Sequence, residues 1–158
     1  MRAAHGKAPP FFPRNMMMKV ISVNSSRRVG EIKEPVHKGR FLRDYGMDGD
    51  AHGGSGRQVS LLARESYEKN EKTASLPWGS YAENITTEGI ILHRLPVGAR
   101  LKIGTVELEV TQIGKRCHAG CAIQSLTGVC VMPLEGIFAR VVTEGEVASG
   151  DEIEILPG

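Results

Sequence analysis

Residues 101–110 alternate strictly between apolar and polar side chains, and this pattern constrains the fold more than any other feature of the chain. Leu101 and Ile103 flank Lys102, and after a Gly-Thr turn the alternation resumes through Val110. Strict alternation in two adjoining runs is typical of a β-hairpin with one buried face and one exposed face. The core is therefore predicted to be built from antiparallel strands.

Further short strands and glycine turns occur on both sides of this hairpin. The other strands are predicted at residues 19–24, 57–60, 137–142 and 153–155. Ser60 is then expected to cap a helix over residues 61–72, a segment rich in good helix formers. Many short strands with glycine turns and one or two short helices predict a mainly β, mostly antiparallel barrel.

The composition excludes several classes of protein. The 158 residues have the length of one domain, and their net charge of +2 is too small to argue for nucleic-acid binding. No apolar run reaches the length needed to span a membrane. The odd count of three cysteines favours a reducing, cytoplasmic compartment. Residues 1–17 lack the apolar core of a signal peptide, and we expect a disordered tail or an upstream translation start there.

The segment around Cys117 and Cys121 is the strongest candidate for chemistry. Lys115, Arg116 and His118 adjoin these cysteines, directly after an alternating strand. Thiolate is the reactive and metal-binding form of cysteine, and neighbouring positive charge favours it. The segment is therefore predicted to be a place where sulfur reacts or binds.

Three interpretations of these cysteines remain open. A reactive or cofactor-binding thiolate fits Cys117 and Cys121, because both are flanked by charge or glycine. Structural zinc would take four nitrogen or sulfur ligands, but adjacent Cys117 and His118 chelate one ion awkwardly. An inert core thiol is the better interpretation for Cys130, which lies between two valines.

Two other segments carry polar side chains that suit a ligand. Residues 49–57 form a glycine-rich segment that contains Asp50 and His52 and ends in Arg57. Asp50 and His52 could bind a metal ion. Alternatively, the backbone N–H groups of the loop and Arg57 could hold an anion. A surface loop with a local turn at Asp50 is the alternative. Asn84 is interpreted either as a turn residue that satisfies backbone groups or as a group that binds a polar ligand.

Taken in order, these motifs resemble the MOSC domain, the C-terminal domain of molybdenum cofactor sulfurases. The resemblance extends over residues 18–156 and defines a predicted domain at 18–158. The motifs that carry it are residues 49–52, 57–62, 83–90, 97–104, 110–117, 135–141 and 145–151. The chain is similar to a small stand-alone bacterial member of this family.

The resemblance implies a pyruvate-kinase-type β-barrel that binds the molybdenum cofactor (molybdopterin) or carries sulfur. The family's functional cysteine, which carries sulfur or ligates molybdenum, matches Cys117, and Cys121 is the alternative. The resemblance also implies that Arg57, with Lys115 or Arg116, holds the pterin phosphate. The remaining cofactor-binding residues that it implies are Asn84, at the pterin edge, and His118.

The chain also departs from larger members of the family. It has no room for their pyridoxal-phosphate-dependent desulfurase domain, so no pyridoxal phosphate is expected, and sulfur must arrive from a partner such as a cysteine desulfurase or a molybdoenzyme. One alternative function is a molybdenum-dependent reductase of N-hydroxylated compounds. Another is a zinc-stabilised module that binds a partner protein.

Overall fold

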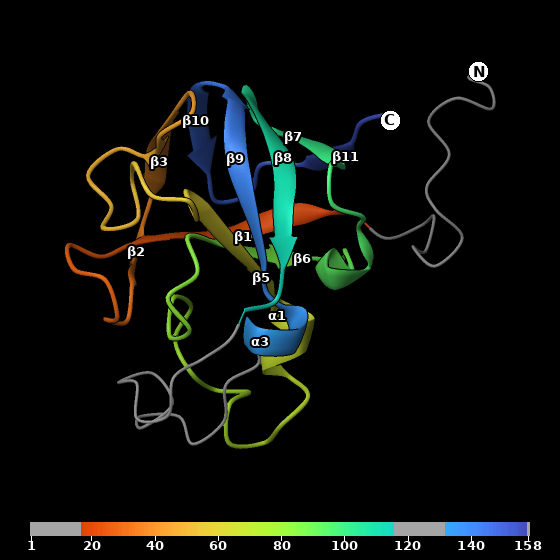
Figure 1. Cartoon of the computed structure of the whole chain (residues 1–158). Coiled ribbons are helices and arrows are strands. Elements are labelled where there is room, and N and C mark those ends of the chain that lie inside the picture. Colours follow the sequence, from red (N-terminus) through yellow and green to blue (C-terminus); the bar gives the residue numbers. More distant parts are fainter. Residues whose placement is uncertain (1–16, 116–131, 158) are drawn as a thin grey trace.

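The computed structural model describes residues 17–115 and 132–157, which fold mainly into β-strands (Figure 1). In chain order the elements are β1 (Lys19–Ser25), β2 (Glu34–Val36), β3 (Lys38–Leu42), β4 (Gly46–Met47), β5 (Val59–Ala63), α1 (Arg64–Tyr67), β6 (Ile85–Glu88), the 3-10 helix η1 (Leu92–Arg94), β7 (Arg100–Ile103), β8 (Val106–Ile113), α3 (Met132–Glu135), β9 (Ile137–Thr143), β10 (Gly145–Ala148) and β11 (Ile153–Ile155).

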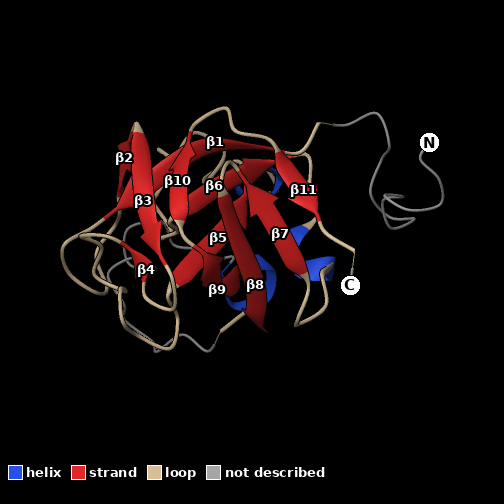
Figure 2. Ribbon diagram, turned by 90° about the horizontal axis from the view of Figure 1, so that it is seen from above, coloured by secondary structure: helices blue, strands red, loops and turns tan. Residues whose placement is uncertain are grey.

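The main sheet closes on itself. Its eight strands follow the order β11-β7-β8-β9-β5-β6-β1-β2, and β1 meets the β11 end where Lys19 bridges Glu152. At this seam the N–H of Ile153 donates to the carbonyl of Met18 over 2.8 Å. The view from above shows the strands arranged around a common centre (Figure 2). All strands of this sheet except β2 therefore form a barrel whose edge groups are hydrogen-bonded.

A smaller sheet covers one side of the barrel. It has the order β10-β3-β4, with Val147 opposite Gly39 in the antiparallel β10–β3 pair. Phe41 of β3 and Val147 of β10 are fully buried in the same core as the barrel side chains. The side sheet therefore shares the barrel's hydrophobic core and is part of the same domain.

The predicted hairpin is confirmed as β7 and β8. Leu101 lies opposite Leu108 and Ile103 lies opposite Val106, and all four side chains are fully buried. Full burial of one such side chain contributes about 1.5–3 kcal/mol. The alternating apolar residues of the sequence thus fill the interior of the barrel.

The helix predicted for residues 61–72 is wrong. Residues Val59–Ala63 form the central strand β5, which pairs with β9 on one side and runs parallel to β6 on the other. Every residue of β5 is buried, so its apolar run has no alternation, and periodicity cannot distinguish such a strand from a buried helix. The helix α1 begins only at Arg64, and Ser60 lies within the strand and caps nothing.

The remaining pairings agree with the predicted fold class. Among the described strands, β5 and β6 form the one parallel pair, and the chain is mainly β and mostly antiparallel with short helices, as predicted. In the described part of the chain, no helix is long and apolar enough to cross a membrane.

A second hydrophobic cluster lies below the barrel, where α1 and α3 pack (Figure 1). Tyr67 meets Trp78 and Tyr81 edge to face, with ring centroids 5.0 Å apart in each pair. Met132 of α3 and Phe138 of β9 belong to the same cluster. Edge-to-face packing favours one ring arrangement, so the cluster gives this end of the barrel a defined shape.

Candidate functional site

The cysteine-containing segment joins β8 to α3, and hydrogen bonds fix the chain at both of its ends. The N–H of Gly114 donates to the carbonyl of Gly136 over 2.7 Å, and Gln112 Nε2 donates to the carbonyl of Gly114 over 2.8 Å. The first bond holds the chain after β8 against the residue that follows α3, and the second fixes the turn at Gly114. The residues predicted in the cysteine-containing segment lie outside the described ranges, and their roles stay predictions: Arg116, Cys117, His118, Cys121 and Cys130.

Arg57 lies beside the base of this segment. Its side chain is exposed, and its guanidinium carbon lies 5.3 Å from the centre of the Phe138 ring. Phe138 is opposite Gln112 in the β8–β9 ladder, three residues before Lys115. None of the ion pairs found among the described residues involves Arg57. Its charge is therefore oriented by an aromatic face and remains available to an anion.

Lys33 and Asp50 form a buried ion pair at the start of the glycine-rich loop, residues 49–57. Lys33 Nζ lies 2.8 Å from Asp50 Oδ1 and 3.1 Å from Oδ2, and both side chains are fully buried. The ammonium also contacts Ser26 Oγ at 3.0 Å and His52 Nδ1 at 3.1 Å. The Asp50 carboxylate thus fixes a buried cation, and its Oδ2 also accepts the N–H of His52, which is the local turn considered for Asp50 from the sequence.

The two members of this pair have shifted pKa values. Burial lowers the pKa of the Lys33 ammonium, Asp50 opposes this shift, and the positive charge of Lys115 lowers the pKa further. Burial alone would raise the pKa of Asp50, but His52, Lys33 and two backbone N–H groups hold it well below its usual range. Lys115 is therefore close enough to act electrostatically on Lys33.

His52 is the accessible member of this cluster. Its side chain is 23% exposed, its ring approaches Lys33, and its backbone N–H donates to Asp50 Oδ2 over 3.0 Å. Among the described residues, no group of three or more His, Cys, Asp or Glu side chains is arranged to hold a metal ion. The Lys33 ammonium is fully buried and already bonded to Asp50, Ser26 and His52, so His52 is the member of this cluster that a ligand can reach.

Asn84 is fully buried between β5 and β1. Its Oδ1 accepts the N–H of Ser60 over 3.0 Å, and its Nδ2 donates to the carbonyl of Asn24 over 3.3 Å. Its backbone N–H also donates to Ser60 Oγ over 3.0 Å. These bonds fit the structural interpretation of Asn84, and its contact with a pterin edge stays a prediction.

Glu83, next to Asn84, is a buried acid that sequence reasoning did not single out. Its Oε2 accepts hydrogen bonds from Tyr67 at 2.6 Å, Thr86 at 2.7 Å and the N–H of Gly79 at 3.1 Å. Burial raises the pKa of Glu83, and the bonds from Tyr67 and Thr86 oppose this shift. Thr86 and Gly79 are close to Glu83 in sequence and Tyr67 is 16 residues away, but no motif or spacing of these residues marks Glu83 as buried.

The closed barrel with its side sheet and the second cluster below it defines a small β-barrel domain. The chain belongs to the MOSC family: residues 48–154 match the family model described as "MOSC domain". The match begins after β3, although β1 supplies one side of the barrel seam. The domain limits of 18 and 158 stay a prediction.

One curated protein has a similar sequence. The "Uncharacterized protein YflK" of Bacillus subtilis (strain 168) is 25% identical over 142 residues, which cover 80% of this chain and 63% of YflK. The chain thus spans less than two thirds of that relative's length.

Two solved structures share the fold. The YuaD protein of B. subtilis has a TM-score of 0.74 at 20% identity, covering 89% of this chain and 96% of its own. YiiM of Escherichia coli has a TM-score of 0.66 at 18% identity, covering 90% and 71%. At these identities the likeness establishes the fold alone.

Proposed function

We propose that this chain binds the molybdenum cofactor or carries sulfur on a cysteine of the segment between β8 and α3. Cys117 is the proposed ligand or acceptor, and Cys121 is the alternative. One observation carries the proposal: Arg57 lies over the ring of Phe138, which is opposite Gln112 at the end of the strand that leads into the cysteine segment. Family membership supports the same function, because MOSC domains are associated with molybdenum-cofactor handling.

The described residues fit the anionic end of such a cofactor. Arg57 offers a planar fork of donors, which matches a phosphate group, and no described carboxylate pairs with it. Lys115 adds a second cation that is half-buried. Arg116 and His118, which follow directly, are proposed to complete this basic surface. When bound, the cofactor would supply redox chemistry at molybdenum, and the protein would supply a soft sulfur ligand and phosphate contacts.

As a sulfur carrier, the chain would act through its own thiolate. A cysteine desulfurase partner would present a persulfide, and the thiolate of Cys117 would attack its terminal sulfur. The new S–S bond forms as the old one breaks, and the partner's thiolate leaves with the electron pair. The cations of Lys115 and Arg116 would favour the attacking thiolate over the thiol.

Two alternatives share this segment and differ in what can be measured. A molybdenum-dependent reductase of N-hydroxylated compounds would turn over a hydroxylamine with an external electron donor. A zinc-stabilised partner-binding module would contain stoichiometric zinc that is lost when Cys117 and Cys121 are replaced. Turnover assays and metal analysis of the purified protein therefore separate these functions.

The deciding experiment is purification from cells that make molybdopterin. Bound pterin and molybdenum are quantified for the natural sequence and for Cys117→Ala, Cys121→Ala and Cys130→Ala, and mass spectrometry measures sulfur addition after treatment with a cysteine desulfurase and cysteine. We expect cofactor or added sulfur with the natural sequence and with Cys130→Ala, and loss with Cys117→Ala or Cys121→Ala. If the natural sequence and every variant lack both pterin and a reducible sulfur adduct, the proposal is disproved.

A further inference from the structure

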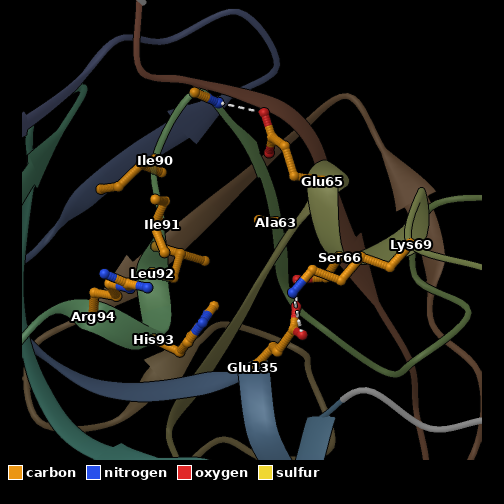
Figure 3. Close-up of a pocket in the computed structure, with 11 residues that line it drawn as sticks. Ala63, Glu65, Ser66, Lys69, Ile90, Ile91, Leu92, His93, Arg94 and Glu135 are labelled. Atoms are coloured by element: carbon orange, nitrogen blue, oxygen red, sulfur yellow. Dashed lines mark hydrogen bonds and ion pairs between the residues drawn. The ribbon is translucent and has the colours of Figure 1, made fainter. Parts of the chain in front are cut away.

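A separate cavity of about 380 Å³ lies between α1, the segment 89–94 and the end of α3 (Figure 3). Ile90, Ile91 and Leu92 form one wall, and Ser66 and Lys69 face them from α1 and the turn after it. A volume of this size with mainly apolar walls and a few polar groups is typical of a small-molecule site. No described residue of the proposed cofactor surface lines this cavity.

The end of the cavity at Glu135 is electrostatically satisfied. Ser66 Oγ donates to Oε1 of Glu135 and Lys69 Nζ donates to Oε2, both over 2.6 Å. Burial would raise the pKa of Glu135, but the bonds from Lys69 and Ser66 lower it below its usual value. The carboxylate is therefore ionised and already paired, so it offers a ligand little further attraction.

The Glu65 end of the cavity is different. Oε2 of Glu65 accepts the N–H of Gly89 over 3.0 Å, and Oε1 makes no hydrogen bond within the described ranges (Figure 3). The side chain as a whole is 38% exposed, but Oε1 itself is buried, so this end of the cavity has a buried acceptor without a described donor. A carboxylate that uses one of its two oxygens retains acceptor capacity for a further donor.

The ion pairs around Glu65 leave an excess of negative charge. Arg64 is shared by Glu65 at 3.9 Å, Glu68 at 3.6 Å and Glu88 at 3.0 Å. Lys19 is the other described cation in this group, 3.6 Å from Glu88. Three carboxylates thus share two cations, which leaves one negative charge in excess.

Positive charge lies on η1, away from Glu65. His93 and Arg94 line the cavity below Ile91 and Leu92 as viewed in Figure 3, and Glu65 lies at the opposite end. A cationic group is therefore favoured at Glu65, where the described carboxylates outnumber the cations. We propose that this cavity binds a small organic amine, with its protonated nitrogen at Glu65 and its apolar body along Ile90 and Ile91.

Titration of the full chain with benzylamine tests this proposal. Benzyl alcohol and benzoate, which share the ring but replace the ammonium by a neutral or an anionic group, are the matched ligands. We expect benzylamine to bind more tightly than either, and Glu65→Gln to weaken it about tenfold or more, because a charged hydrogen bond is lost. The glutamine oxygen can still accept the N–H of Gly89, so the fold should be retained.

Three further variants separate this site from general electrostatics and from the thiol site. Glu68→Gln removes an equal charge from the same Arg64 group, but Glu68 does not line the cavity, so benzylamine affinity should change little. Arg94→Gln should leave amine binding unchanged or strengthen it. Cys117→Ala should have no effect, which distinguishes this site from the thiol site. Tighter binding of benzoate than of benzylamine, or equal losses in Glu65→Gln and Glu68→Gln, would overturn the proposal.

Discussion

Lys33 and Asp50 form an ion pair of 2.8 Å with both side chains fully buried, although they are 17 residues apart in the chain. Each charge is acceptable in the interior only because the other is present. The pair also joins the irregular segment before β2 to the glycine-rich loop after β4. It therefore fixes the loop that leads into Arg57.

Asp50→Asn should destabilise the protein by about 3–5 kcal/mol at neutral pH, because it leaves the Lys33 ammonium buried without a counter-charge. The pKa of Asp50 is lower in the folded state than its ordinary 3.8, so the stabilisation is present above pH 3.8 and is lost as the pH falls further. Urea unfolding of both proteins across this pH range measures the difference, which should shrink in acid.

The control for this change is the exposed ion pair between Lys38 and Glu146, 3.7 Å apart. Glu146→Gln should cost only about 0–1 kcal/mol, as expected for a solvent-exposed pair. Equal costs for Asp50→Asn and Glu146→Gln would contradict the role given to the buried pair.

Gly79 bonds both to Lys33, the partner of buried Asp50, and to the buried acid Glu83. Its carbonyl accepts the N–H of Lys33 over 2.9 Å, and its own N–H donates to Glu83. Its φ is +91°, and a Cβ there would overlap the carbonyl oxygen of Lys33. Gly98 has a similar φ of +96° with nothing within 4 Å of an added Cβ. In denaturant unfolding, Gly79→Ala should therefore cost about 1–3 kcal/mol more free energy of unfolding than Gly98→Ala. Equal costs would show that the backbone at Lys33 moves away from the added Cβ without loss of stability.

Tyr67→Phe tests the hydrogen bond to Glu83. In the folded state burial raises the pKa of Glu83 above its ordinary 4.5, so its contribution to stability is full below pH 4.5 and is lost as the pH rises through the folded value. Loss of the Tyr67 donor raises that folded pKa further. The variant should lose about 1.5–3 kcal/mol at neutral pH and less at pH 4.5. Tyr45→Phe, at an exposed tyrosine, should show no such dependence on pH.

Arg57→Ala tests the phosphate-binding part of the proposed site. The side chain is exposed, so unfolding should change by only about 0.5 kcal/mol. Pterin retention should fall about tenfold or more, because a charge-assisted contact is lost. Arg100→Ala, at an exposed arginine of β7, is the matched control. Undiminished retention in Arg57→Ala would remove Arg57 from the site.

The barrel was predictable where one face of a strand is buried and the other is exposed. The β7–β8 hairpin alternates for that reason, and so its register follows from the sequence. The central strand β5 was not predictable in this way, because both of its faces are covered and its apolar residues follow one another without a period. Its neighbours β6 and β9 decide its conformation, and they lie far along the chain.

The candidate site was predictable only in its local chemistry. The cations and the cysteines are adjacent in sequence, so a shared role is predicted from the sequence, and it stays a prediction because residues 116–131 lie outside the described ranges. Lys33 gave no signal, because its burial depends on Asp50, on His52 and on the carbonyl of Gly79. Such a cluster of polar groups exists only after distant segments meet.

The seam between β1 and β11 has a consequence for the chain's connectivity. Because Lys19 and Glu152 are neighbours there, a short linker between residues 17 and 157 would span little distance. A circularly permuted chain opened at an exposed turn, such as the one at Gly104, should then form the same strand pairs, although its strands would be synthesised in a different order.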